Sequence, residues 1–116
     1  FEGTLIKESI EDDSVLDFMN VHKMELWKTG GMPKYWTVLS FTSDKGDLPE
    51  RMSKVMISDP DRGGNWFVDF KAGNVKFIVF RDKVLKYHIG NAEEKALVCE
   101  ECRKLGITDG EMNWAE

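Results

Sequence analysis

The sequence lacks a long apolar run, since none of its apolar stretches approaches the ~20 residues needed to span a bilayer. It also does not open with the charged and then apolar segment of a secretory signal. The chain begins with Phe1 rather than methionine, which leaves open the removal of a leader or tag. We therefore expect no membrane association.

An excess of basic residues is also lacking. The 116 residues include 16 Lys and Arg against 21 Asp and Glu, which gives a formal net charge of −5 and a pI near 5.1. The Lys and Arg residues do not cluster in a stretch that could follow a phosphate backbone. Because nucleic-acid-binding domains usually carry a basic patch, the composition argues against a nucleic-acid partner.

Cysteine is scarce, with only Cys99 and Cys102 in the chain. This is not the framework of a disulfide-stapled secreted domain, so we expect a reduced, cytoplasmic protein. A redox pair needs a thiol of lowered pKa, whereas these cysteines lie among glutamates in the second half of an expected helix. A zinc site needs four ligands, and the remaining candidates, His22 and His88, fall on opposite faces of the expected sheet. We therefore expect no metal and no cofactor, with Cys102 buried as a small apolar residue.

Recognisable catalytic motifs are missing as well, which leaves open whether the protein is an enzyme. Neither histidine lies in a nucleophile-and-base motif. The Asp-Pro-Asp and Arg-Gly-Gly of loop 57–65 fail as a calcium loop, because the twelfth position is Phe70 and not glutamate. Turn chemistry is the simpler interpretation. Arg62 remains a candidate binding residue, since exposed loops often carry function.

The composition that is present is that of an ordinary folded domain. Apolar residues make up 41% and charged residues 32% of the chain. The length is sufficient for one real core. We predict a single domain over residues 1–116.

The most informative stretch is 65–91, which we interpret as a meander of three strands. Its runs rich in Val, Ile and aromatic residues are 66–71, 75–81 and 84–89, and the short turn sequences between them are typical of successive hairpins. A two-residue turn at Asp82-Lys83 places Phe80 opposite Leu85.

The first hairpin of the meander offers two registers. A loop of Gly73-Asn74 alone would set Lys71 opposite Lys76, which places like charges together. A loop of Ala72–Asn74 places Trp66 opposite Phe80 and gathers the apolar residues on one face. We predict the second register, because burial of one face penalises a one-residue slip.

This register defines two faces of the meander. One is apolar and consists of Trp66, Val68, Phe70, Ile78, Phe80, Leu85, Tyr87 and Ile89. The other is mixed and consists of Phe67, Asp69, Lys71, Val75, Phe77, Val79, Val84, Lys86 and His88. The simpler interpretation of the mixed face is that loops or a second layer cover its apolar residues. The alternative is a binding surface, in which Asp69, Phe77 and His88 form one row across the strands.

The other elements flank the meander. Before it we predict a strand at 3–9 near an edge, a short helix at 14–19, a hairpin of 21–28 and 34–42, and a helix at 48–56 capped by Asp47. After it we predict a helix at 92–105 between Asn91 and Gly106, and a final turn at 108–111 that folds Met112 and Trp114 onto the core. In the hairpin, pairing Lys28 with Lys34 places Met24, Leu26, Trp36 and Val38 on an apolar face, and Trp27 and Tyr35 together on the other.

The element order is therefore β-α-β-β-α-β-β-β-α. We predict an α+β fold with one mostly antiparallel sheet of about six strands and helices packed on one face. The hairpin connections exclude a doubly wound parallel sheet. Whether the sheet stays open or curls around a cavity is left open.

Two functions fit these features. The first is a small non-catalytic interaction or regulatory module that binds a protein partner, or a second copy of itself, through an aromatic-bearing sheet face. The second is a small-molecule-binding protein or enzyme with a pocket between a curled sheet and the helices, where Asp69 and His88 supply polar groups. We favour the first. The candidate binding residues are Phe67, Asp69, Phe77, Lys86, His88, Trp27, Tyr35 and Arg62.

Overall fold

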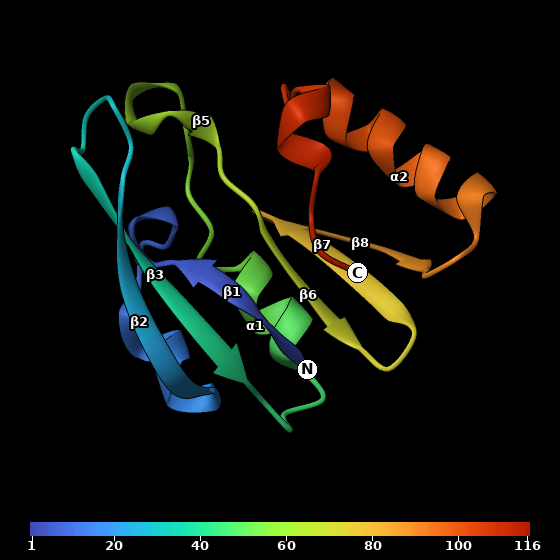
Figure 1. Ribbon diagram of the computed structural model, residues 1–116, viewed down its shortest axis with the longest axis horizontal. Helices are drawn as coiled ribbons and strands as arrows, with labels where there is room; N and C mark the ends of the chain where they lie inside the picture. Colours follow the sequence, from blue (N-terminus) through green and yellow to red (C-terminus); the bar gives the residue numbers. More distant parts are fainter.

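The computed structural model describes residues 1–116 and is built on a six-stranded antiparallel sheet in the order β2-β3-β1-β6-β7-β8 (Figure 1). The strands are β1 (Glu2–Ile6), β2 (Asn20–Lys28), β3 (Tyr35–Thr42), β6 (Val68–Ala72), β7 (Val75–Phe80) and β8 (Lys83–His88). Two short strands, β4 (Ser58–Asp59) and β5 (Gly64–Asn65), pair separately. The predicted α+β class and six-stranded antiparallel sheet are confirmed.

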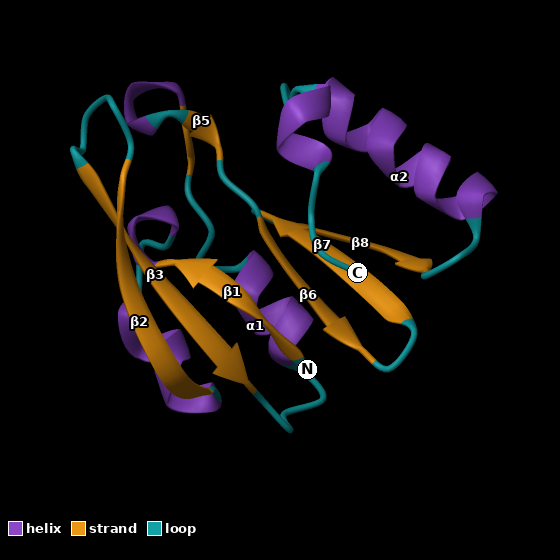
Figure 2. Cartoon of the chain, in the orientation of Figure 1, coloured by secondary structure: helices purple, strands orange, loops and turns teal.

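Two α-helices and four 3₁₀ turns complete the fold (Figure 2). They are α1 (Leu48–Ser53) and α2 (Ala92–Lys104), with 3₁₀ turns η1 (Lys7–Ser9), η2 (Asp13–Phe18), η3 (Pro60–Arg62) and η4 (Asp109–Met112). The Asn91 side chain accepts a hydrogen bond from the Glu94 amide at 3.1 Å and starts α2, as predicted. Asp47 does not cap α1 through its side chain, which instead accepts a hydrogen bond from Arg51 Nε at 2.7 Å.

The sheet has a hydrophobic core on each face. In the first core, Val79 of β7 packs with Val68 and Phe70 of β6 and with Leu48 and Met52 of α1. All five side chains are buried. Because successive residues of a strand point to opposite faces, the neighbours of Val79 in β7 must be covered by something other than α1.

The second core covers those neighbours. Ile78 and Phe80 of β7 pack with Tyr87 of β8, with Cys102 of α2 and with Trp114 of the C-terminal tail. In Figure 1, β1 passes in front of α1, whereas the C-terminal tail passes in front of β7. The prediction of helices on one face is therefore wrong: α1 and α2 lie on opposite faces, because β7 carries apolar residues at both odd and even positions.

The register between β6 and β7 differs by one residue from the predicted one. Phe70 lies opposite Phe77, and Val68 lies opposite Val79. The loop is the two-residue Gly73-Asn74, with Gly73 at a φ of 59° that suits glycine at the first position of such a turn. The predicted pairing of Trp66 with Phe80 is wrong, and so is the apolar face built on it.

The like-charge pair that argued against this register is present and is relieved locally. Lys71 lies opposite Lys76. Lys76 donates to Asp69 Oδ1 at 2.7 Å and to the Ala115 carbonyl, while Lys71 Nζ lies 3.4 Å from a Glu2 carboxylate oxygen. Each ammonium group therefore has its own acceptor, and the repulsion that we expected does not decide the register.

The second hairpin of the meander turns at Arg81-Asp82 rather than at Asp82-Lys83, so Phe80 lies opposite Lys83 and Ile78 lies opposite Leu85. This differs from the predicted pairing by two positions. A shift of two keeps every side chain on its face. Ile78, Phe80, Leu85 and Tyr87 therefore share a face, as predicted, although Phe80 does not lie opposite Leu85.

The first strand lies in the middle of the sheet and not near an edge, between β3 and β6. Gly3 allows β1 to occupy this central position next to β6. A Cβ at residue 3 would lie 2.5 Å from Phe70 Cβ and 2.7 Å from the Asp69 carbonyl oxygen. Only a residue without a side chain allows β6 to approach β1 this closely.

Candidate interaction surface

The strand β2 forms one edge of the sheet and has β3 as its only strand neighbour. All nine of its residues are exposed, and they include the apolar side chains of Val21, Met24, Leu26 and Trp27. Natural proteins usually keep edge strands short or protect them with charges and prolines, since an unpaired edge can accept another strand. A long, exposed and partly apolar edge strand is therefore a surface available to another chain.

The register of the β2–β3 hairpin places the two predicted aromatic binding residues on different faces. Trp27 lies opposite Trp36, and Lys28 lies opposite Tyr35. The predicted pairing of Lys28 with Lys34 is wrong by one residue. As in the meander, alternation could not fix the register, because Val38 and Leu39 are adjacent in β3 and both are buried. Trp27 and Tyr35 remain on the surface, exposed by 49% and 48%.

The loop that joins β2 to β3 is held by its own hydrogen bonds. The Thr29 hydroxyl donates to the Pro33 carbonyl at 2.6 Å and accepts from the Gly31 amide at 3.1 Å, while the Thr29 amide donates to the Lys34 carbonyl at 2.9 Å. Met32 at the loop is exposed. We define the hairpin surface as the exposed apolar side chains of this unit, namely Val21, Met24, Leu26, Trp27, Met32 and Tyr35.

A register irregularity interrupts the start of β2. The pairing with β3 runs without a break from Lys28 back to Lys23 and then shifts, so that His22 has no partner residue opposite it. Such a β-bulge bends a strand and locally increases its twist. The regular part of the edge therefore begins at Lys23.

The aromatic residues predicted on the mixed face of the meander are packing residues. Phe77 stacks on Phe70 with ring centroids 5.6 Å apart, and Phe1 meets it edge-on at 5.4 Å. Phe67 lies on Phe80 at 5.6 Å, next to the second core. Both are only partly exposed. Their place in a binding surface stays a prediction, but their geometry is that of core residues.

The predicted row of Asp69, Phe77 and His88 does not form. Asp69 lies opposite Ile78 and faces the second core side, whereas Phe77 faces the first. His88 Nδ1 lies 2.9 Å from Glu94 Oε1, and the His88 amide donates to the same oxygen at 2.8 Å. These contacts, the amide hydrogen bond first, hold the pKa of Glu94 below its ordinary value and tie β8 to the start of α2.

The two remaining predicted residues have contrasting surroundings. Lys86 is exposed on β8 opposite Phe77. Arg62 donates to Glu11 Oε1 at 2.6 Å and to Asp59 Oδ2 at 3.2 Å. Arg81 also donates to Glu11, and these hydrogen bonds, that from Arg81 first, hold the pKa of Glu11 below its ordinary value. Arg62 is thus part of an ion-pair network that joins separate segments.

The two cysteines differ in accessibility. Both are free thiols; Cys102 is buried, whereas Cys99 is partly exposed. Burial raises the pKa of the Cys102 thiol to about 11, so it stays protonated at neutral pH. A thiolate, and not a thiol, is the nucleophile in cysteine chemistry.

We expect an alkylating reagent at pH 8 to modify only Cys99 in the folded protein and both cysteines in the unfolded protein. The measurement is the mass of the protein after a timed reaction. The Cys99→Ser variant serves as the control and should show no native modification. Equal rates at the two positions would contradict the assignment of Cys102 to the second core.

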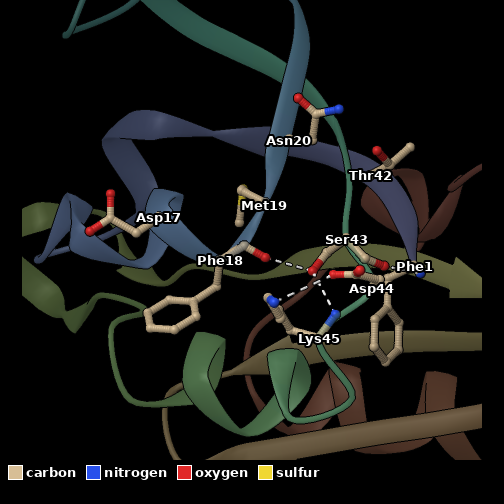
Figure 3. A pocket seen from close by; sticks show the side chains of 9 residues that line it. All are labelled: Phe1, Asp17, Phe18, Met19, Asn20, Thr42, Ser43, Asp44 and Lys45. Atoms are coloured by element: carbon tan, nitrogen blue, oxygen red, sulfur yellow. Dashed lines mark hydrogen bonds and ion pairs between the residues drawn. The ribbon is translucent and has the colours of Figure 1, made fainter.

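Two of the hollows on the surface are lined mainly by polar residues. The larger, about 580 Å³, lies between η2 and the end of β3 (Figure 3). There the Ser43 hydroxyl donates to the Phe18 carbonyl at 2.6 Å and accepts from the Lys45 amide at 3.2 Å, while Asp17 and Asp44 lie on opposite sides. The smaller, about 260 Å³, lies beside the Asp69–Lys76 pair. The structure contains no group of three or more His, Cys, Asp or Glu side chains that could hold a metal ion.

Met24 and Leu26 are the residues of the hairpin surface that the sequence analysis assigned to an apolar face. Both are 68% exposed. The sequence of β2 does not reveal this exposure, because Lys23 and Glu25 alternate with Met24 and Leu26 as they would in a strand with one buried face.

None of the helices has the length and apolar character required to cross a membrane.

Comparison with known proteins does not identify a relative. Searches against protein-family models, curated proteins and solved structures each found no match to this chain.

Proposed function

We propose that the protein is a non-catalytic interaction module that binds a protein chain through its β2–β3 hairpin. The observation that carries this proposal is the edge strand β2, which is nine residues long and exposed throughout. When a strand is added to such an edge, main-chain hydrogen bonds supply affinity and alternate side chains supply specificity. β2 offers both, since its outer edge has no strand partner and its side chains are accessible.

The composition of the hairpin surface supports the same proposal. Trp27 and Tyr35 belong to the residue types that dominate binding hot spots, and both are about half exposed. The hydrogen bonds of the 29–34 loop reduce the conformational entropy that binding would have to offset. The binding residues that we propose are therefore those of the hairpin surface, with the meander residues in a supporting role.

No observation favours the alternative of a pocket between the sheet and the helices. The two cores fill that space.

The two free thiols support the expectation of a reducing, cytoplasmic environment for the module.

The proposal can be tested with a photo-crosslinking amino acid at position 26. Leu97 is a matched control position, because it is also leucine, it lies on α2, and it is 65% exposed against 68% for Leu26. We expect protein adducts from position 26 in cells of the source organism and few or none from position 97. Adducts of equal yield at the two positions, or no protein adduct at position 26, would contradict the proposal.

A further inference from the structure

The outer edge of β2 is suited to a second copy of the same strand. In a continuous antiparallel sheet made by two identical edges, the two-fold axis stands perpendicular to the sheet. Residues that lie opposite each other must have their side chains on the same face. One residue of β2 therefore lies opposite its own counterpart, and the axis passes midway between these two copies. The register is therefore specified by the one residue of β2 that faces itself.

The charges of β2 discriminate among these registers. An axis through Lys23, Glu25 or Lys28 would set identical charges opposite each other, which is unfavourable. An axis through Met24 sets Lys23 opposite Glu25 of the second copy, and symmetry repeats this pair on the other side. Axes at Leu26 or Trp27 avoid identical charges but give Lys23 and Glu25 no opposite charge across the interface.

The geometry within one copy is compatible with the register through Met24. Lys23 Nζ and a Glu25 carboxylate oxygen already lie 3.3 Å apart, and both side chains are largely exposed. Pairing would join two such ion pairs into a cluster of four alternating charges. Met24 would face its counterpart on the axis, where two exposed thioether side chains become buried together.

The bulge at His22 limits how far a regular pairing between two copies of β2 can extend. The regular part of the edge begins at Lys23, so the axis at Met24 lies just inside it. Beyond Glu25, the side chains of Leu26 and Trp27 would then cover the bulged residues of the second copy. Both are apolar and exposed in the single chain.

We propose that two copies of this chain associate by antiparallel pairing of β2 with β2 about a two-fold axis at Met24, with Lys23 facing Glu25 of the second copy. This inference rests on the proposed function, and it specifies the bound chain as a second copy. Other proteins that bind the same edge are alternative outcomes of the test.

The test uses charge reversal at the two exposed positions. We expect the wild-type chain to be dimeric by sedimentation equilibrium, and Lys23→Glu or Glu25→Lys to raise the dissociation constant of the dimer by about tenfold or more, since two attractive pairs become repulsive. An equimolar mixture of the two variants restores opposite charges on both sides and should form a heterodimer. The double variant Lys23→Glu/Glu25→Lys should again form homodimers. Glu100→Lys, an exposed charge reversal on α2, which packs on β8 at the other end of the sheet, is the matched control and should leave the dimer unchanged.

The outcomes separate this inference from the proposed function. A monomeric wild-type chain at several hundred micromolar, a dimer insensitive to both reversals, or a mixture that stays monomeric would overturn the pairing. If the chain is monomeric while position 26 crosslinks to a different protein, the proposed function stands and the second copy is wrong. A monomeric chain without adducts at position 26 overturns both.

Discussion

Alanine at Phe70 is expected to lower the free energy of unfolding by ~3–5 kcal/mol, and alanine at Ile78 by ~2–5 kcal/mol. Both side chains are fully buried. Phe70 lies in the first core, where the rings of Phe41 and Phe77 contact it with centroids 6.0 and 5.6 Å away. Ile78 lies in the second core. Each truncation removes apolar burial and leaves a cavity on a different face of the sheet.

Urea titrations of the two variants would measure these losses. Leu97→Ala is the control, because its exposed side chain lies outside the hairpin surface and should change stability by no more than ~0.5 kcal/mol. A loss below about 1 kcal/mol for either core variant would mean that the sheet has only one real core. The pair of variants is therefore a direct test of the two-sided architecture.

Methionine at Lys76 is expected to lower the free energy of unfolding by ~2–3 kcal/mol. The Lys76 side chain is only 4% exposed and its ammonium group holds both Asp69 and the Ala115 carbonyl. Removal of the charge leaves Asp69 without its partner, and breaking a fully buried pair costs ~3–5 kcal/mol. The smaller value expected here reflects the partial exposure of Asp69, at 30%.

Lys71→Met provides the matched comparison, because Lys71 is the cross-strand neighbour of Lys76 and is more exposed. Its ion pair with Glu2 is near the surface, where such pairs contribute ~0–1 kcal/mol. Urea titrations of both variants give the difference. Equal losses of unfolding free energy for the two variants would show that burial does not make the Lys76 ion pair more stabilising than the Lys71 pair.

The sequence was sufficient to place α2 and the turn after it, because their boundaries depend on local chemistry. The predicted helix 48–56 instead ends at Ser53, and the predicted strand 3–9 ends at Ile6. Asn91 and Gly106 bound α2, and the turn after Thr108 and the burial of Met112 are present as predicted. These signals act within one or two turns of chain. They do not depend on which strand or helix lies next to them.

The registers could not be obtained from the sequence, because the rule used to choose them assumes one buried face. Val79 and Ile78 are adjacent and both fully buried, so alternation does not distinguish the two alignments. The repulsion expected between Lys71 and Lys76 is offset by acceptors distant in the chain, including the Ala115 carbonyl. The position of β1 likewise depends on contacts with strands far along the chain, which the local pattern around Gly3 does not reveal.

The candidate site was only partly accessible to sequence reasoning for the same reason. Trp27 and Tyr35 were selected for their residue types and are on the surface. Phe67 and Phe77 were selected from a face that exists only in the wrong register. Met24 and Leu26 were missed because nothing local indicates that β2 is an edge strand with no layer above it.

The exposure of β2 also has a consequence for the order in which the sheet would open. Detaching β2 removes no residue from either core, so its amide hydrogens should exchange through a local opening of lower free energy than global unfolding. Opening β7 disrupts both cores at once, so its amides should exchange only when the whole molecule unfolds. The edge can therefore adjust its twist to an incoming strand without loosening the rest of the molecule, and a bound strand would slow exchange at that edge alone.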